Sequence, residues 1–221
     1  MKIPAIIIPA PWLFPIAAGM IAMAALPPIA AANTYNVNVN TSSVSGTSGF
    51  LDFQFDTGNG SSQAATAIIR AFTGGTFTGS PSITGTVIGT LPATTTLTNS
   101  TPLNEYFVGF QFGSAFSFAL DLSGPAVTSP NGTSTAGSTF GIGIYDAGEN
   151  PILTNQTSTT GYAGLIDILL SGATRPTAFP NGTGPSVVTF TAVVPEPATI
   201  ALIGAGLAGL TVVRRRSRRA T

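Results

Sequence analysis

The clearest structural signal in the chain is Tyr106-Phe107-Val108-Gly109-Phe110-Gln111-Phe112-Gly113-Ser114-Ala115-Phe116-Ser117-Phe118-Ala119-Leu120-Asp121-Leu122. Large apolar residues occupy every second position over 106–112 and again over 116–122. Side chains of an extended strand point alternately to its two faces, so a period of two indicates a strand with one buried face. The stretch therefore predicts two strands that each contribute an aromatic and aliphatic stripe to a core.

The same alternation recurs on both sides of this stretch. The clear segments are Tyr35–Val39, Leu51–Phe55, Phe140–Ile144 and Val187–Val193, and the shorter ones are Ala67–Phe72, Ile83–Ile88, Thr95–Leu97 and Leu165–Leu170. Turn-forming pairs such as Gly74-Gly75, Asn131-Gly132 and Asn181-Gly182 separate them. No long stretch has a helical period. About ten short strands over roughly 160 residues predict an all-β fold, a β-sandwich of the jelly-roll kind.

The composition excludes several kinds of chemistry. The 221 residues include no cysteine and no histidine, so Ser–His and Cys–His nucleophilic catalysis are impossible and the commonest metal ligand is missing. Between Asn33 and Val194, seven carboxylates against two cations, Arg70 and Arg175, leave five net negative charges. A surface of this charge does not attract phosphate backbones, so no nucleic-acid partner is expected.

The first 32 residues are typical of a secretory signal peptide. Lys2 precedes an apolar stretch that ends at Ala30-Ala31-Ala32. A basic start, an apolar middle and an Ala-x-Ala site, here Ala30 and Ala32, predict export through a translocon and cleavage by signal peptidase. We expect the mature chain to begin at Asn33. The alternative is an uncleaved anchor, but six prolines interrupt the segment too often for a good spanning helix.

The C-terminal residues 195–221 have three parts. Pro195-Glu196-Pro197 is followed by sixteen uncharged residues, Ala198–Val213. As a helix these would span ~24 Å, which predicts a short transmembrane helix. A basic cluster follows, and it should stay on the cytoplasmic side: Arg214, Arg215, Arg216, Arg218 and Arg219. The alternative is a plain tail anchor, which would not explain Pro-Glu-Pro placed against the helix.

This three-part order resembles the PEP-CTERM sorting domain. The resemblance implies recognition of Pro195, Glu196 and Pro197 by an exosortase, an integral-membrane cysteine enzyme of Gram-negative bacteria that make exopolysaccharide. These three residues are then substrate, not catalyst, and the product is released or attached at the cell surface. The core also resembles a group of PEP-CTERM proteins of unassigned role, through Gly49–Phe55, Tyr106–Phe110 and Phe116–Leu120.

Two acidic turns are the candidates for chemistry in the core. Asp56-Thr57-Gly58 resembles the aspartic-protease triplet, with Asp146-Ala147-Gly148 as its partner, which would make a secreted hydrolase. The favoured interpretation is that both triplets form turns between strands, because Asp-x-Gly after a strand is an ordinary turn sequence. Asp56, Asp146 and Glu149 are also calcium candidates, although the spacing after Asp56 does not fit an EF-hand.

Carbohydrate binding is the other function that the core leaves open. Sugar sites stack rings on exposed aromatic residues. The one tryptophan, Trp12, lies in the signal peptide, which leaves four tyrosines in the core: Tyr35, Tyr106, Tyr145 and Tyr162. A carbohydrate-binding module associated with exopolysaccharide is therefore the alternative function.

The sequence as a whole predicts an exported, non-enzymatic protein of the cell surface or biofilm matrix. We expect residues 33–194 to form the surface domain, and we expect no cofactor and no catalytic residues. The tail would hold the protein at the inner membrane only until exosortase acts on it.

Overall fold

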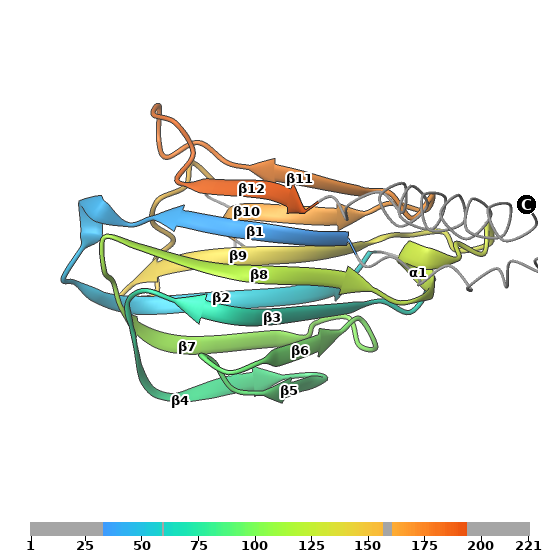
Figure 1. Ribbon diagram of the computed structural model, residues 1–221, viewed down its shortest axis with the longest axis horizontal. Helices are drawn as coiled ribbons and strands as arrows, with labels where there is room; N and C mark the ends of the chain where they lie inside the picture. Colours follow the sequence, from blue (N-terminus) through green and yellow to red (C-terminus); the bar gives the residue numbers. More distant parts are fainter. Residues whose placement is uncertain (1–32, 59, 157–160, 194–221) are drawn as a thin grey trace, which may run out of the picture.

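The computed structural model describes residues 33–58, 60–156 and 161–193, which form two six-stranded antiparallel sheets packed face to face (Figure 1). The first, called the β1 sheet, has the order β12 (Val188–Val193), β1 (Asn33–Asn40), β8 (Ala115–Ser123), β3 (Thr66–Thr73), β6 (Thr95–Thr98) and β5 (Val87–Gly89). The second, called the β2 sheet, has the order β11 (Thr174–Ala178), β10 (Tyr162–Ile168), β9 (Ser138–Asp146), β2 (Ser48–Thr57), β7 (Glu105–Gln111) and β4 (Thr76–Thr84). Short helical turns occur at η1 (Ser42–Val44) and α1 (Pro125–Thr128). The predicted all-β sandwich is confirmed.

The strands are paired in a nested order. β1 pairs with β8, β2 pairs with β7, and β3 pairs with β6. From β1 to β4 the chain crosses between the sheets at every step. This is a long antiparallel ribbon wrapped around a core, which is the jelly-roll arrangement. The ribbon brings together residues that are far apart in the sequence.

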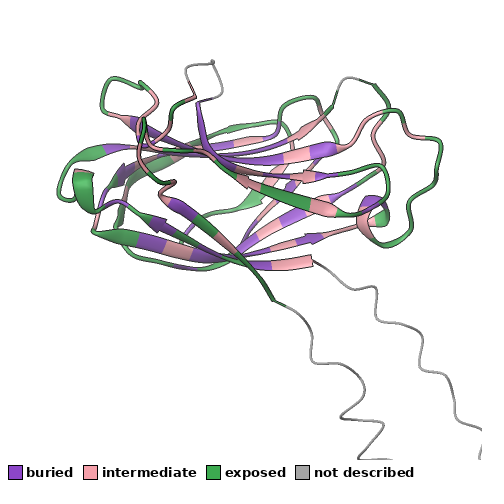
Figure 2. Ribbon diagram, turned by 90° about the horizontal axis from the view of Figure 1, so that it is seen from above, coloured by how far each residue is buried: buried purple, intermediate pink, exposed green. Residues whose placement is uncertain are grey.

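The core consists of the stripes that the alternation predicted. Leu51, Phe53 and Phe55 on β2 are fully buried and face the stripe of β8. Phe53 packs edge-on against Phe118 of the opposite sheet, with ring centroids 5.4 Å apart. Figure 2 shows buried residues recurring along the strands, whereas the loops at both ends are mostly exposed. The aromatic stripes therefore supply the apolar burial that stabilises the sandwich.

The structure also corrects the predicted strand boundaries. The segment Ile83–Ile88 is not one strand, because Gly85, with φ +69°, turns the chain from β4 into β5 and from one sheet to the other. β4 and β11 were not predicted. Both are edge strands with a proline, Pro81 and Pro176, and few buried side chains, so they lack the apolar stripe. β10 ends at Ile168 rather than at residue 170.

Both ends of the described domain lie at the same end of the sandwich. β1 begins where β12 ends, and Thr34 is the register partner of Val193 (Figure 1). We call this the terminal end and the opposite one the far end. The predicted signal peptide, the predicted transmembrane helix and the Pro-Glu-Pro motif lie outside the described residues. Within the described ranges, no helix is long and apolar enough to cross a membrane.

Candidate functional site

Polar and aromatic residues gather on the outer face of the β2 sheet. On β2, Phe50, Asp52, Gln54 and Asp56 alternate with the core stripe and therefore point outward. Phe50 stacks on Phe107 of the neighbouring strand β7, with centroids 4.9 Å apart. This face was expected to be solvated, yet Asp52 is only 2% exposed.

Gln54 is the centre of a hydrogen-bonded cluster on this face. Its Nε2 donates to Asp52 Oδ2 at 2.7 Å and to Glu105 Oε1 at 3.1 Å. Its Oε1 accepts from the Tyr162 hydroxyl at 2.6 Å. The amide is therefore fixed between two carboxylates and a tyrosine that comes from more than a hundred residues away. We call Asp52, Gln54, Glu105 and Tyr162 the Gln54 cluster.

Two glycines of β9 make room for the tyrosine rings. A Cβ added at Gly141 would lie 2.4 Å from Tyr162 Cε1, and one at Gly143 would lie 2.6 Å from Tyr145 Cε2. Any larger residue would push the rings off the sheet. The Phe-Gly-Ile-Gly alternation thus serves two purposes, because its apolar residues fill the core while its glycines allow the tyrosines to lie flat on the outside.

Two carboxylates of this face, Asp52 and Asp56, are disfavoured in their charged form. Burial, followed by the charges of Glu105 and Asp56, raises the pKa of Asp52 to about 7. Burial also raises the pKa of Asp56, against the lowering effect of a hydrogen bond from the Asn104 amide. The pKa of Tyr145 is raised to about 12 by burial and then by the charge of Asp52. The site therefore resists additional negative charge.

A cleft of about 350 Å³ opens beside the Gln54 cluster. Its walls come from β2, β9, β10 and the segments that flank β10 and β11: Asp56, Thr57, Thr139, Gln156, Tyr162, Leu165 and Phe179. The lining combines apolar side chains with a carboxylate, an amide and three hydroxyls. We call it the Asp56 cleft.

A second cleft of about 280 Å³ lies toward the terminal end, and Thr139 lines both. It contains an ion pair in which Arg175 Nη2 donates to Asp167 Oδ2 at 2.8 Å. The Thr139 hydroxyl donates to the other oxygen of Asp167 at 2.9 Å. We call it the Arg175 cleft. Because the two clefts share a wall residue, they follow one another along the outer face.

The proposed pairing of Asp56 with Asp146 is wrong. The register places Thr139 opposite Asp56 and Gly49 opposite Asp146, so the two carboxylates lie at opposite ends of β2. Seven residues of strand separate them, or ~23 Å at about 3.3 Å per residue. Two carboxylates this far apart cannot share a proton, so they form no aspartic-protease dyad.

Asp146 belongs instead to the turn after β9, at the far end. Its Oδ1 accepts from the amides of Gly148 and Asn150, at 2.8 and 2.9 Å. These bonds, that of Asn150 first, lower the pKa of Asp146. Glu149 adopts φ +60° within the same turn. Within the described ranges no three acidic side chains come together in a way that could hold a metal ion, so Asp56, Asp146 and Glu149 do not form a joint calcium site.

We therefore expect the thermal stability of the protein to be independent of calcium. EDTA should leave the melting temperature unchanged, because the carboxylate of Asp146 is already satisfied by its own turn. Asp146→Ala should lower the melting temperature equally with and without EDTA. A melting temperature that rises with added calcium only in the unsubstituted protein would contradict this expectation.

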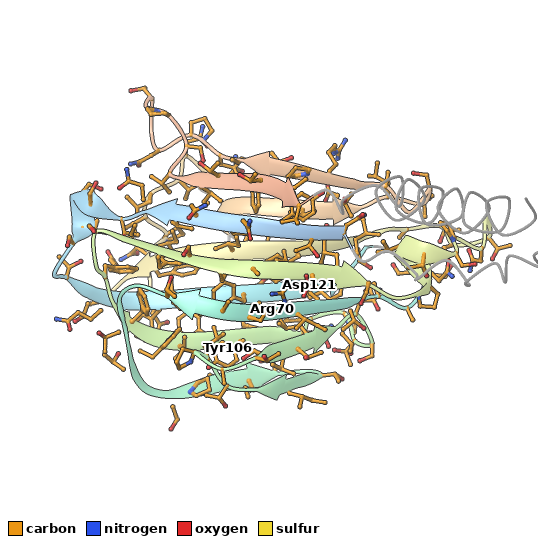
Figure 3. The ribbon with its side chains drawn as sticks, in the orientation of Figure 1. Arg70, Tyr106 and Asp121 are labelled. Carbon is orange, nitrogen blue, oxygen red and sulfur yellow. The ribbon has the colours of Figure 1, made fainter. Side chains whose placement is uncertain are left out.

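The four core tyrosines divide into two pairs. Tyr35 and Tyr106 are buried between the sheets, where Tyr106 accepts a hydrogen bond from the Leu91 amide at 3.0 Å (Figure 3). Tyr145 and Tyr162 lie on the outer face of the β2 sheet and belong to the site described above. Of these four tyrosines, Tyr162 lines the Asp56 cleft.

The outer face of the β1 sheet has a different character. Arg70 on β3 and Asp121 on β8 lie side by side (Figure 3), with two hydrogen bonds of 2.6 and 3.1 Å between them. Thr34 adds a third hydrogen bond to Asp121, at 2.7 Å. Arg70 first lowers the pKa of this carboxyl. The charges here are paired and exposed, and no cleft described above opens on this face.

Two buried asparagines were missed by sequence reasoning. Asn104 is fully buried, and its amide group bonds the backbone at Phe55, Thr86 and Thr101. Asn99 joins the two sheets through the Ala65 amide and Ser138 Oγ. Both lie in segments rich in Asn, Ser and Thr, where composition suggests surface loops. No sequence signal separates these two from exposed asparagines.

The C-terminal segment matches a known family model. Residues 193–219 match the model of the PEP-CTERM protein-sorting motif. The chain carries a PEP-CTERM sorting motif. The motif indicates an exported protein that is targeted to exosortase, with its tail held in the membrane on the way to the cell surface. The predicted resemblance of the tail is confirmed.

The PEP-CTERM match covers the tail and does not extend over the sandwich. Comparison with curated proteins and comparison with solved structures found no match. The match begins at Val193, the last residue of β12. The PEP-CTERM motif is thus joined directly to a strand of the folded domain.

Proposed function

We propose that this protein is a non-enzymatic component of the cell surface or extracellular matrix, delivered as a folded β-sandwich and processed at both ends. The observation that carries the proposal is the pairing of β1 with β12. It sets Thr34 and Val193 side by side at the terminal end. Removal of the signal peptide and of the tail would then leave the rest of the domain untouched.

The distance between the domain and its tag is short. Three peptide steps separate Val193 from Glu196, a reach of at most ~11 Å for an extended chain. Pro195 and Pro197 favour the extended conformation. Exosortase would therefore act close to the terminal end of the sandwich, while the far end points away from the membrane and is free to meet partners.

The polar chemistry of the core supports a non-enzymatic role. The chain contains no histidine, and Asp56 and Asp146 are separated by the length of β2. Asp52 has a raised pKa, but it is buried within the Gln54 cluster and lines neither cleft. A typical glycoside hydrolase uses two accessible carboxylates on either side of one bond, which Asp52, Asp56 and Asp146 do not offer.

The intact mass of the protein from its native host tests the proposal. We expect a mass that runs from Asn33 to near Pro195, because signal peptidase and exosortase would remove both tags. Glu196→Gln should retain the tail, whereas Glu149→Gln, in an exposed turn of the sandwich, should be processed normally. A mass that still includes Arg214–Arg219 would mean that the tail is only a membrane anchor.

A further inference from the structure

We propose that the Asp56 cleft and the Arg175 cleft together form a binding groove for a non-acidic oligosaccharide, whose sugar units are neutral or carry an amine. The groove crosses the outer face of the β2 sheet near the terminal end, with Thr139 between its two parts. This inference goes beyond the proposed function, since a matrix component need not bind any glycan.

The size and shape of the groove suit two or three sugar units. The two clefts, of about 350 and 280 Å³, are open and lie in sequence. Sites for small ligands start at ~300 Å³. An open groove accepts a chain that continues at both ends, whereas a closed pocket would accept only a single small molecule.

The wall of the Asp56 cleft is apolar on one side. Leu165 points outward from β10, and Phe179 follows β11 directly, with both side chains partly exposed. The ring of Tyr162 lies beside them, held by its hydrogen bond to Gln54. A pyranose presents a face of C–H groups that packs on such aromatic and aliphatic surfaces.

The other side of this cleft offers hydrogen-bond acceptors that the protein bonds only at long distances. Asp56 Oδ1 is 3.3 Å from the Asn104 amide, and Oδ2 is 3.5 Å from the Tyr162 hydroxyl. That hydroxyl already donates to Gln54 at 2.6 Å, so it gives Asp56 little. Asp56 is therefore a half-buried carboxylate with lone pairs available to a ligand. Sugar hydroxyls or an ammonium group are the donors that would satisfy it.

The Arg175 cleft adds donors as well as acceptors. The side chain of Arg175 is two-thirds exposed, although one of its guanidinium nitrogens is bonded to Asp167. Its remaining N–H groups can donate to sugar oxygens, and Asp167 can accept from sugar hydroxyls. A polyol ligand needs donors and acceptors in alternation, and this pair supplies both.

The charge of the groove selects against acidic glycans. Asp56 lines it, and Asp52 and Glu105 lie behind it in the Gln54 cluster. The one cation that lines either cleft, Arg175, is neutralised by Asp167. A uronic acid or a sulfated sugar would bring another negative charge next to Asp56, whose charged form is already disfavoured by burial.

Binding to an array of neutral, amine-bearing and acidic oligosaccharides tests the proposal, with the secreted protein used as recovered from culture. We expect binding to be confined to non-acidic glycans. Isothermal titration with a glycan found in this way should then show at least a tenfold loss of affinity, ~1.4 kcal/mol, for Phe179→Ala and for Asp56→Ala. Asp56→Asn, which keeps an acceptor beside the Asn104 amide, should retain part of the affinity and serves as the folded control.

Asp146→Ala is the matched control, because it removes a carboxylate at the far end that lines neither cleft, and it should leave affinity unchanged. The proposal falls if no oligosaccharide binds, if acidic glycans bind best, or if the affinity is the same in all the variants. None of these results depends on removal of the tail, so failure here leaves the proposed function standing, and a retained tail leaves this proposal standing.

Discussion

Replacing Asp52 with asparagine is expected to make the protein more stable at pH 8 and to change its stability little at pH 4. Asp52 is 2% exposed, and its pKa is raised to about 7 from an ordinary value of 3.8. The folded state therefore holds a proton that the unfolded state releases between these two values. The contribution of Asp52 to the free energy of unfolding is most favourable below pH 3.8. It declines as the pH rises from 3.8 to about 7 and stays at its lower value above that.

The size of the effect follows from the pKa difference. About three pKa units correspond to ~4 kcal/mol of unfolding free energy at pH 8, and the imperfect fit of an amide reduces the expected gain to about 2–4 kcal/mol. Asparagine keeps an oxygen to accept from Gln54 Nε2, as Asp52 Oδ2 does. It also removes an ionisable group whose Oδ1 has no hydrogen-bond partner. Urea unfolding at pH 4, 6 and 8 measures the result.

Asp121→Asn is the matched control, with the opposite sign. The pKa of Asp121 is lowered, first by its hydrogen bonds with Arg70, so this carboxylate stabilises the fold above its ordinary pKa and loses that effect as the pH falls. The pair is partly exposed, so its loss should cost at most about 1 kcal/mol at pH 8. A destabilised Asp52→Asn protein at pH 8 would mean that the buried group is ionised and well solvated by its neighbours.

Replacing Phe53 with alanine is expected to destabilise the protein by about 3–5 kcal/mol. The Phe53 side chain is fully buried on β2, edge-on to Phe118 and stacked at 6.3 Å on Phe140. Because it links three strands from both sheets, the cavity left by the substitution cannot close by the movement of one neighbour. Chemical unfolding at a fixed pH measures the loss.

Phe50→Ala, on the same strand, is the control for Phe53→Ala. It distinguishes the effect of losing a buried side chain from the effect of placing alanine in a strand. Phe50 points to the opposite face, where it is partly exposed and stacks only on Phe107. It should cost ~1 kcal/mol, the value of an aromatic pair at a surface. Equal losses for the two substitutions would contradict the register of β2 and the assignment of its faces.

The strands that sequence reasoning found are those with one buried stripe. Tyr106–Phe112 and Phe116–Leu122 correspond to β7 and β8. They were recognisable because the apolar residues at every second position are the ones that are buried. β4 and β11 have no such alternation, since edge strands bury few side chains and tolerate proline. The sequence also did not reveal that β7 and β8 lie in different sheets, because period two is the same whichever sheet a strand joins.

The candidate site could be predicted only in fragments. Asp56 and Tyr162 were each noted as chemically interesting, but nothing linked positions so far apart in the chain. The register of β2, β9 and β10 brings them to within 3.5 Å. The same register moved Asp146 away from Asp56, although the two triplets look alike in sequence. Local motifs do not encode the distance between strands that meet only through long-range pairing.

The sequence by itself determined the class of fold and the sorting signal of the protein, because both depend on local sequence patterns. Alternation reports burial, and the Pro-Glu-Pro, apolar and arginine order is a linear tag that exosortase would meet as an extended chain. Only the tertiary structure showed which segments and side chains lie together. It pairs β12 with β1, buries Asp52, and places Asp56 in the wall of a cleft. Neighbours depend on strand pairing across the whole chain, which no local pattern specifies.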